Sequence, residues 1–231
     1  NYTKHFLSYF IAFGLLISVF SSLTSYATHA SDVNDSIYKY AQEVALRIKK
    51  NVFKSSIDQM DQVVVALANH QSVKNFIRTG DMANLSDMQN LFLTMTNSNA
   101  YVMQARLIDA NGRELVRVNR DNKQSVPYVV KKSELQDKSS RDYFETLSKM
   151  KRSEIWHSPM DLNVENAKLD VPYRPTIRIA LALFKDEKFA AMVICNVLVQ
   201  DLIQSVQKDL LFNVYIVDKD GYYLLHPDNQ Y

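Results

Sequence analysis

Residues 102–119 read VMQARLIDANGRELVRVN, a stretch that predicts a β-hairpin. Two arms rich in strand-forming residues flank Asn111-Gly112, a dipeptide typical of tight β-hairpin turns. A similar pattern, NVYIVDKDGYYLLH, occupies residues 213–226, with Asp218 and Gly221 at the places of Asp109 and Gly112. The repeat predicts two related modules, each containing this hairpin. Because the sequence ends at Tyr231, we expect the second module to be truncated and the chain to be a fragment of a longer protein.

The sequence between the two hairpins predicts one antiparallel sheet flanked by helices, which is an α+β fold. Segments whose apolar residues recur at helical spacing alternate here with continuous apolar runs typical of strands, and Pro, Asp and Glu bound these runs. In chain order we expect a helix over 139–150, an extended segment over 154–158, a polar loop over 163–171, strands over 176–184 and 189–197, and an amphipathic helix over 198–211.

The N-terminal part carries an apolar segment. No Lys, Arg, Asp or Glu lies between Lys4 and Asp32, and Phe6 to Tyr26 is long enough to cross the roughly 30 Å core of a bilayer as a helix. The segment is longer than the apolar part of a usual signal peptide, which favours an uncleaved membrane anchor. A cleaved signal peptide remains the alternative, since small residues precede Ser31. In either case we expect the rest of the chain outside the cytoplasm.

A long helix is predicted next, because no Gly or Pro occurs from Leu15 to Thr79. Apolar residues recur at helical spacing from Ile37 to Ile48 and again, after a phase slip, from Phe53 to Leu67. The helical pattern is expected to end over 69–80, and a shorter helix is expected over 85–96. The apolar stripe suits either a sister helix in a dimer or the chain's own domain.

Composition excludes several classes of protein. A formal charge of +2 gives no basic surface for nucleic acid, and Cys195 is the one cysteine, so neither a disulfide framework nor a Cys-rich zinc site is possible. The five histidines show no metal-ligand spacing, so we expect no metal or cofactor. His157, Ser158 and Asp161 contain the residue types of a hydrolase triad, but they lack a nucleophile elbow, and we expect no catalysis from this region.

Three segments carry a resemblance to a known family: DKSSRDYF at 137–144, WHSPMDLN at 156–163 and PTIRIA at 175–180, followed by an apolar strand that ends at Asn196. In this order they resemble the double Cache family of bacterial extracytoplasmic sensor domains, whose two PAS-like modules stand on a long helix that rises from the membrane. The resemblance covers residues 33–231. It implies a transmembrane segment (1–30), a stalk helix and helical connection (31–98), a membrane-distal Cache module (99–198), a linking helix (199–212) and the start of a membrane-proximal module (213–231).

The resemblance also implies a ligand pocket in the distal module, between the sheet and the helix and loop that cross it. The residues it places there are Arg141, Tyr143, Phe144, Trp156, Ser158, Asp161, Asn163, Tyr173 and Arg178. Their chemistry suits a small carboxylate or amine, since Arg binds carboxylates and Asp or an aromatic face can hold a cation. Structural roles are the alternatives: Arg178 pairing with Asp161, Arg141 bracing the helix start, and Trp156 in the core.

The sequence therefore predicts a sensor in the bacterial inner membrane, with a periplasmic domain that binds a small molecule and forms a homodimer. No enzyme activity is expected of this stretch itself. The double Cache resemblance implies an output domain beyond Tyr231, such as a histidine kinase, a diguanylate cyclase or phosphodiesterase, or a chemotaxis transducer. The alternatives are a structural or adhesion-type envelope protein with a non-binding module and a secreted binding protein.

Overall fold

The computed structural model describes residues 2–151, 154–162, 164–165, 168–169, 175–206, 212–217 and 221–226. The chain divides into two compact units, Asn1–Lys50 and Asn51–Tyr231. Because the second unit holds the sheet and every residue of the expected ligand pocket, it receives most of the description below.

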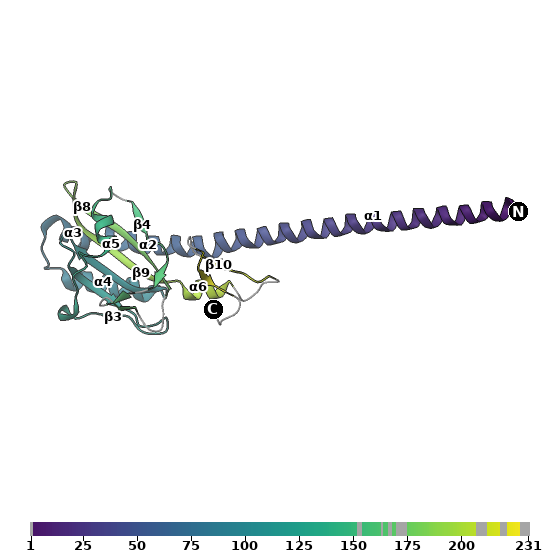
Figure 1. The fold of residues 1–231 in the computed structure, drawn as a ribbon. Coiled ribbons are helices and arrows are strands. Elements are labelled where there is room, and N and C mark those ends of the chain that lie inside the picture. Colours follow the sequence, from purple (N-terminus) through teal and green to yellow (C-terminus); the bar gives the residue numbers. More distant parts are fainter. Residues whose placement is uncertain are drawn as a thin grey trace. The chain divides into compact units, whose positions relative to one another are not determined.

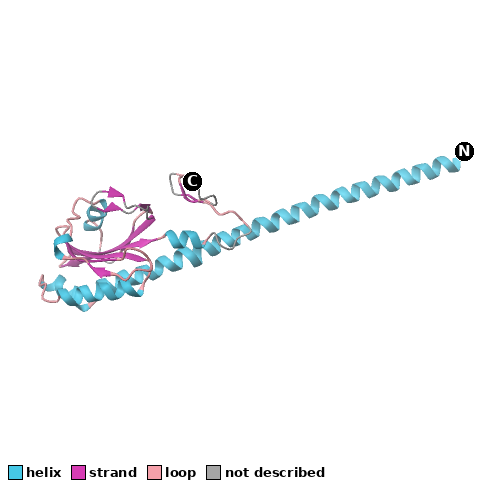
Figure 2. Ribbon diagram, turned by 90° about the horizontal axis from the view of Figure 1, so that it is seen from below, coloured by secondary structure: helices cyan, strands magenta, loops and turns pink. Residues whose placement is uncertain are grey.

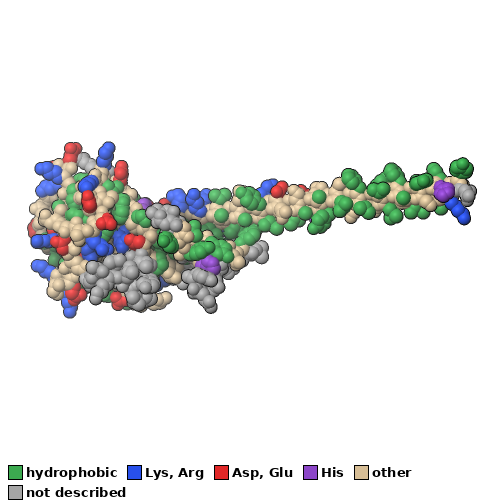
Figure 3. All heavy atoms as spheres, viewed as in Figure 1, with side chains coloured by type: hydrophobic (Ala, Val, Ile, Leu, Met, Phe, Trp, Pro, Cys, Tyr) green, Lys and Arg blue, Asp and Glu red, His purple; other side chains and the backbone are tan. Residues whose placement is uncertain are grey.

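The first unit consists mainly of helix α1 (Tyr2–Arg47), the long ribbon that begins at the N-terminus in Figure 1. Hydrophobic side chains cover its surface (Figure 3), and large ones such as Phe6, Phe13 and Phe20 are at least 63% exposed. Within the described part of the chain, the helix that begins at Tyr2 is the one that is long and apolar enough to cross a membrane. Its exposed apolar surface is what a lipid-facing helix requires.

The phase slip in the apolar pattern corresponds to a π-helix, η1 (Ile48–Lys54). A π-helix has i to i+5 hydrogen bonds, so it takes more residues per turn and shifts the apolar stripe that follows. Helix α2 (Ser55–Asn69) then resumes α-helical geometry and buries Met60, Val64 and Leu67. The slip is therefore a local change of helix type, with no loop between Ile48 and Phe53.

Two further helices follow α2. The sequence predicted the end of helical structure over 69–80, and this is wrong: α3 (Gln71–Thr79) follows after His70, a single extended residue. The His70 ring accepts a hydrogen bond from the backbone N–H of Ser72, which caps the new helix. Helix α4 (Leu85–Ser98) begins where the sequence predicted and buries Met88 and Phe92.

The second unit is built on an antiparallel sheet of seven strands in the order β3-β2-β1-β9-β8-β4, with β5 also pairing with β8. Both arms of the predicted hairpin are confirmed to the residue, as β1 (Val102–Asp109) and β2 (Glu114–Asn119). The remaining strands are β3 (Tyr128–Val129), β4 (Ile155–His157), β5 (Asp161–Leu162), β8 (Pro175–Lys185) and β9 (Lys188–Leu198). This α+β architecture is the predicted fold class.

The sheet lies between two unlike layers (Figure 2). Helices α2 and α4 pack against one face: α2 contacts β8 and β9, and α4 contacts β1 and β2. We call this the helical face, and its strand residues, such as Ala105, Ile179 and Cys195, are apolar and fully buried. The short helix α5 (Asp142–Ser148) covers the other face, which we call the α5 face. Because strand residues alternate between faces, each strand serves both layers.

Cys195 belongs to the helical face and is fully buried. Burial raises the pKa of its thiol to about 12, against the smaller, opposite effect of the positive charge of Arg106. The thiol is therefore protonated at physiological pH, and a protonated buried thiol is a poor nucleophile and a poor metal ligand.

Other boundaries differ from expectation. The helix predicted over 139–150 is shorter, because residues 139–141 lie in turns before α5. The stretch predicted as a loop over 163–171 includes the strand pair β6 (Val164–Glu165) and β7 (Lys168–Leu169). Helix α6 (Gln200–Ser205) begins after β9, so Leu198 belongs to the strand. The second hairpin forms an antiparallel pair, β10 (Ile216–Val217) and β11 (Tyr223–Leu225). The remaining short element is a 3-10 helix, η2 (Lys132–Glu134).

The turn between β1 and β2 is a site of close backbone approach. Gly112 has a φ of +85°, which an L side chain rarely adopts. A Cβ at this position would lie 2.5 Å from the Cα and the backbone N of Ser139. The carbonyl oxygen of Gly112 also accepts a hydrogen bond of 2.7 Å from the backbone N–H of Lys138. A glycine at position 112 therefore allows the segment before α5 to pack on the hairpin.

Replacing Gly112 with Ala should lower the free energy of unfolding of the full chain in detergent by roughly 2–5 kcal/mol, since backbone strain adds to a steric clash. Gly80→Ala is the matched control, because Gly80 also has positive φ (+72°) but a Cβ added there would meet nothing within 4 Å. The control should lose about 1–2 kcal/mol. Denaturant unfolding measures both, and equal losses would contradict the close approach at Ser139.

Candidate ligand-binding site

The α5 face of the sheet carries two groups of side chains, one apolar and one polar. The strand register aligns Ala182, Met192 and Ile108 in one row across β8, β9 and β1, and Arg178, Asn196 and Gln104 in another. Residues paired in an antiparallel sheet point to the same side. The face is therefore apolar toward one end of the strands and polar toward the other.

Aromatic residues predicted from the sequence lie in the apolar group. Tyr143 belongs to a buried cluster with strand residues of β1, β8 and β9, and Phe144 and Trp156 pack against this cluster. The ring of Phe144 meets that of Phe189 edge to face, with the centroids 5.9 Å apart. These predicted residues thus come together as one wall that joins α5 to the sheet.

Three other predicted residues form a second assembly at the β8 edge. The side chain of Arg178 is buried, and its Nη1 lies 2.7 Å from both carboxylate oxygens of Asp161. The backbone N–H of Arg178 donates to the hydroxyl of Ser158, and the carbonyl of Arg178 accepts from the N–H of Ser158, each at 2.9 Å. This geometry fastens the segment after β4 to β8, in keeping with the structural alternative for Arg178.

The remaining predicted residues have other positions. Arg141 is the residue before α5, and its carbonyl oxygen accepts hydrogen bonds from the N–H groups of Phe144 and Glu145. Asn163 and Tyr173 lie outside the described residues. The roles of all nine residues in binding stay predictions.

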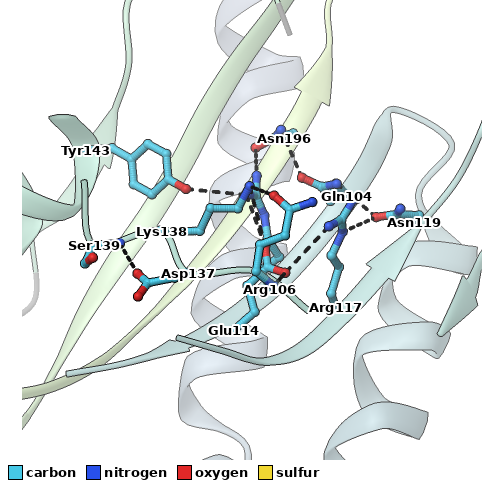
Figure 4. Close-up of polar contacts among 11 residues, drawn as sticks. Gln104, Arg106, Glu114, Arg117, Asn119, Asp137, Lys138, Ser139, Tyr143 and Asn196 are labelled. Carbon is cyan, nitrogen blue, oxygen red and sulfur yellow. Dashed lines mark hydrogen bonds and ion pairs between the residues drawn. The ribbon is translucent and has the colours of Figure 1, made fainter. Parts of the chain in front are cut away.

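The sequence missed a polar cluster at the centre of the α5 face, which Figure 4 shows. Arg106 on β1 is 2% exposed, and its Nη2 donates to the side-chain carbonyl of Asn196 on β9 at 2.7 Å. Its Nη1 lies 3.4 Å from the hydroxyl of Tyr143, so the cluster adjoins the aromatic wall. Gln104 donates to the side chain of Asn119 on β2 at 2.9 Å and accepts from Asn196 at 3.3 Å. Asn196 therefore links Arg106 to Gln104, and Gln104 extends the cluster to β2.

Glu114 is the carboxylate of this cluster, and three cations surround it. Its carboxylate oxygens lie 3.6 Å from Arg106 Nη1, 3.6 Å from Arg117 Nη1 and 4.0 Å from Lys138 Nζ. All four residues are at most 7% exposed. At these distances the cations attract the carboxylate without forming short hydrogen bonds, and Oε1 of Glu114 has no hydrogen-bond partner among the described residues. Removing one member of a buried group of charges leaves the others without compensation, so these side chains depend on one another.

A β-bulge places Glu114 on this face. Leu107 pairs with Val116, but the next residue of β1, Ile108, pairs with Glu114, so Leu115 is the extra residue of β2. Without the bulge, Glu114 would share the side of Val116, which is the apolar helical face. The bulge therefore turns the carboxylate toward Arg106 and Arg117.

Lys138 reaches the cluster because the segment before α5 folds back along β2. The N–H of Glu114 donates to the carbonyl of Gln136 at 3.0 Å, and the N–H of Gln136 donates to Oε2 of Glu114 at 3.0 Å. The ammonium of Lys138 then lies 2.6 Å from the side-chain oxygen of Gln136. The sequence did hold a signal for part of the cluster. Gln104 and Arg106 are polar residues that alternate with apolar ones, and the strand is buried along nearly its whole length.

The structure does not assemble the triad residues for catalysis. The Nε2 atom of His157 lies 2.7 Å from Asp61 on α2, whereas the hydroxyl of Ser158 donates to the carbonyl of Pro159 at 2.6 Å. Within the described ranges, no group of three or more His, Cys, Asp or Glu side chains is placed to hold a metal ion.

Two surface hollows lie beside the helices of the second unit. One of about 340 Å³ is lined by α2, β4 and β8, and one of about 440 Å³ by α2, α3 and the end of β8. Ala68 and Phe184 border both hollows. None of the seven predicted residues that the structure describes lines either of them, nor do Arg106, Glu114 or Lys138.

Comparison with known proteins gives a family and a set of related folds. The family model described as the sensor domain of bacterial histidine kinases matches residues 37–231. No curated protein matches the chain significantly.

Several solved structures share the fold. A domain of a protein assigned to the sensory box/GGDEF family from Vibrio parahaemolyticus aligns with a TM-score of 0.72 at 23% identity, over 83% of this chain and 72% of that one. The extracellular domain of vpHK1S-Z8, assigned as a histidine kinase, gives 0.65 at 23% identity, over 82% and 71%. The ligand-binding domain of the Campylobacter jejuni chemoreceptor Tlp3, in complex with 4-methylisoleucine, gives 0.59 at 15% identity, over 80% and 70%.

Replacing Glu114 with Gln should destabilise the chain by about 3–5 kcal/mol, because three buried cations lose their shared carboxylate. Glu145→Gln is the matched control: Glu145 pairs with Lys149 at 2.6 Å, but its side chain is 71% exposed. The control should change the free energy of unfolding by at most about 0.5 kcal/mol. Urea denaturation of the full chain in detergent measures both, and similar small effects would mean that the cluster is not held by its charges.

Proposed function

Because this chain belongs to the family of bacterial histidine kinase sensor domains, we propose that it is the extracytoplasmic part of a membrane receptor that senses a small molecule. Family membership confirms the predicted resemblance to extracytoplasmic sensors. Ligand binding is supported by Tlp3, whose ligand-binding domain has the same fold and holds 4-methylisoleucine. The ligand of this chain is a separate question that its own residues must answer.

The observation that carries the proposal is the asymmetry of the sheet. The helical face is packed with apolar side chains, as a purely structural layer would be. Among the described residues, the α5 face buries four cationic side chains, one carboxylate and several amides beside an aromatic wall. Replacing buried ion pairs with apolar residues is often neutral or stabilising. A few polar groups beside apolar walls are the usual composition of a small-molecule site. We therefore place ligand binding on the α5 face.

Strand β4 supplies a route from this site to the long helix. Trp156 packs against the apolar cluster of the α5 face, and its neighbour His157 points to the opposite face and contacts Asp61 of α2. A ligand that shifts the aromatic wall would move β4 and thereby change the packing of α2. Such a change transmits a signal only if the ligand binds the two arrangements with different affinities.

The remaining parts of the receptor follow from this proposal. The apolar segment within residues 1–30 would span the inner membrane, residues 31–98 would form the stalk and helical connection, and residues 99–198 would form the periplasmic binding module. Residues 199–212 would link it to a second module that begins at 213, and two copies would pair as a homodimer. The relatives from kinase, GGDEF and chemoreceptor proteins support an output domain of one of these kinds.

A thermal unfolding screen of the full chain in detergent tests the proposal. We expect at least one compound among amino acids, organic acids, amines, purines and sugars to raise the melting temperature in a concentration-dependent way, because a ligand that binds only the folded state stabilises it. If a folded sample responds to none of these classes, the structural envelope protein becomes the better interpretation.

Variants of Arg178 and Asp161 distinguish ligand contact from loop bracing. If Arg178 contacts the ligand, Arg178→Gln should weaken binding of the screen's best compound about tenfold or more, and it should do so equally in an Asp161→Asn background. If Arg178 only fastens the loop through Asp161, either single substitution removes the brace completely. The two single variants and the double variant should then bind the compound with one and the same affinity. Isothermal calorimetry measures all four proteins.

A further inference from the structure

We propose that the two hollows beside α2 form one binding site for a small amphipathic anion, a carboxylate with an apolar tail. The tail would lie in the hollow between α2, β4 and β8, which we call the apolar hollow. The carboxylate would lie in the hollow between α2, α3 and the end of β8, which we call the cationic hollow. This site is at the edge of the sheet, so it goes beyond the binding proposed for the α5 face and does not depend on it.

The two hollows adjoin each other. Four residues border both of them: Ala68, Asn69, Leu183 and Phe184. The elements around them are in contact, since α2 contacts both β8 and α3, and α3 contacts β8 beside it (Figure 1). Their volumes of about 340 and 440 Å³ each fall within the roughly 300–1,000 Å³ of small-molecule sites. One elongated ligand therefore fits across both hollows.

The apolar hollow suits a hydrocarbon tail. Among the described residues that line it, Asn69 is the only polar one. Val65, Ile155 and Leu183 are each half-buried, so part of their apolar surface faces water in the hollow. An alkyl chain that covers this surface removes it from water, which is favourable.

The cationic hollow suits a carboxylate. Lys74 and Arg78 line it from one side of α3, four residues apart, and Lys185 lines it from the end of β8. Asp186 is the one carboxylate among its described lining residues, so cations are in excess. Within the described part of the chain, these three cations form no ion pair, and Arg78 makes a single long hydrogen bond of 3.5 Å to Asn75. The hollow therefore favours a negative group on the ligand.

The two properties together select the ligand class. An inorganic anion would leave the apolar hollow empty, and a neutral hydrocarbon would leave the cations without an anion. A molecule with a charged head and an apolar tail satisfies both hollows at once.

The position of the site connects it with the proposed signal. Ala182 belongs to the buried cluster of the α5 face, and Phe184 packs against that cluster, yet both also line the apolar hollow. A ligand there would touch α2 and this cluster together. It would thus alter how α2 packs on the sheet, provided that it binds the two arrangements with different affinities.

The test uses hexanoate as the probe, with the full chain in non-ionic detergent at constant pH and ionic strength. Acetate lacks the tail, hexanamide lacks the charge and hexylamine reverses it. We expect hexanoate to raise the melting temperature in a concentration-dependent way and more than these three compounds do. An equal shift with hexanamide or hexylamine would overturn the anion, and an equal shift with acetate would overturn the tail. A folded sample that does not respond to hexanoate would overturn the site and leave the sensor function to its own screen.

Substitutions then locate the bound hexanoate, with affinities measured by isothermal calorimetry. Arg78→Gln and Lys185→Gln should each weaken binding about threefold and the double variant about tenfold, because exposed charges contribute modestly and independent effects add. Lys131→Gln is the matched control, since Lys131 is exposed and lies near β3 at the opposite edge of the sheet. Asp186→Asn should strengthen binding about threefold, because it removes the one carboxylate of the cationic hollow. Asp186 has a φ of +48°, which Asn adopts readily, so this variant keeps the turn.

Two results would contradict the site. Unchanged affinity in the double variant, or an equal loss in Lys131→Gln, would mean that hexanoate binds elsewhere. If light scattering shows that Arg78→Gln changes the number of chains in the particle, a second copy of the chain covers the hollows and the small-molecule assignment is wrong.

Discussion

A buried group of charges on one side of the antiparallel sheet joins β1, β2 and the segment before α5. Arg106, Arg117 and Lys138 share the carboxylate of Glu114 away from water, at distances too long for short hydrogen bonds. Such an arrangement is tolerated only where surrounding packing holds it in place. The amides of Gln104 and Asn196 and the aromatic wall supply that packing on the same face.

The opposite face supplies the stability that this arrangement requires. Helices α2 and α4 bury Met60, Leu67 and Phe92 against strand residues of β1, β2, β8 and β9 that are mainly apolar. One sheet thus carries an apolar layer on its helical face and buried charges on its α5 face. Because successive residues of a strand point to opposite faces, neighbouring residues of β4 contact both layers: Trp156 packs against the apolar cluster of the α5 face, and His157 contacts Asp61 of α2.

The long helical region shows how a local irregularity preserves this arrangement. The π-helix over Ile48–Lys54 shifts the apolar stripe, so that α2 presents Met60, Val64 and Leu67 to the sheet. The sequence revealed the slip as a break in periodicity. It did not reveal whether a loop, a kink or a wider helical turn produced it, since all three change the phase in the same way.

The hairpin at 102–119, the main strands and the long helices could be predicted from the sequence, because hydrophobic period and turn residues are local signals. The resemblance to an extracytoplasmic sensor came from the segments at 137–144, 156–163 and 175–180. It also selected Tyr143, Phe144 and Trp156, which the structure brings together. Only the tertiary structure decided that Glu114 faces Arg106. A bulge at Leu115 reverses the side to which Glu114 points, and the backbone of residues 136–138 brings Lys138 to it. Both depend on pairing between segments far apart in the chain, which no local pattern encodes.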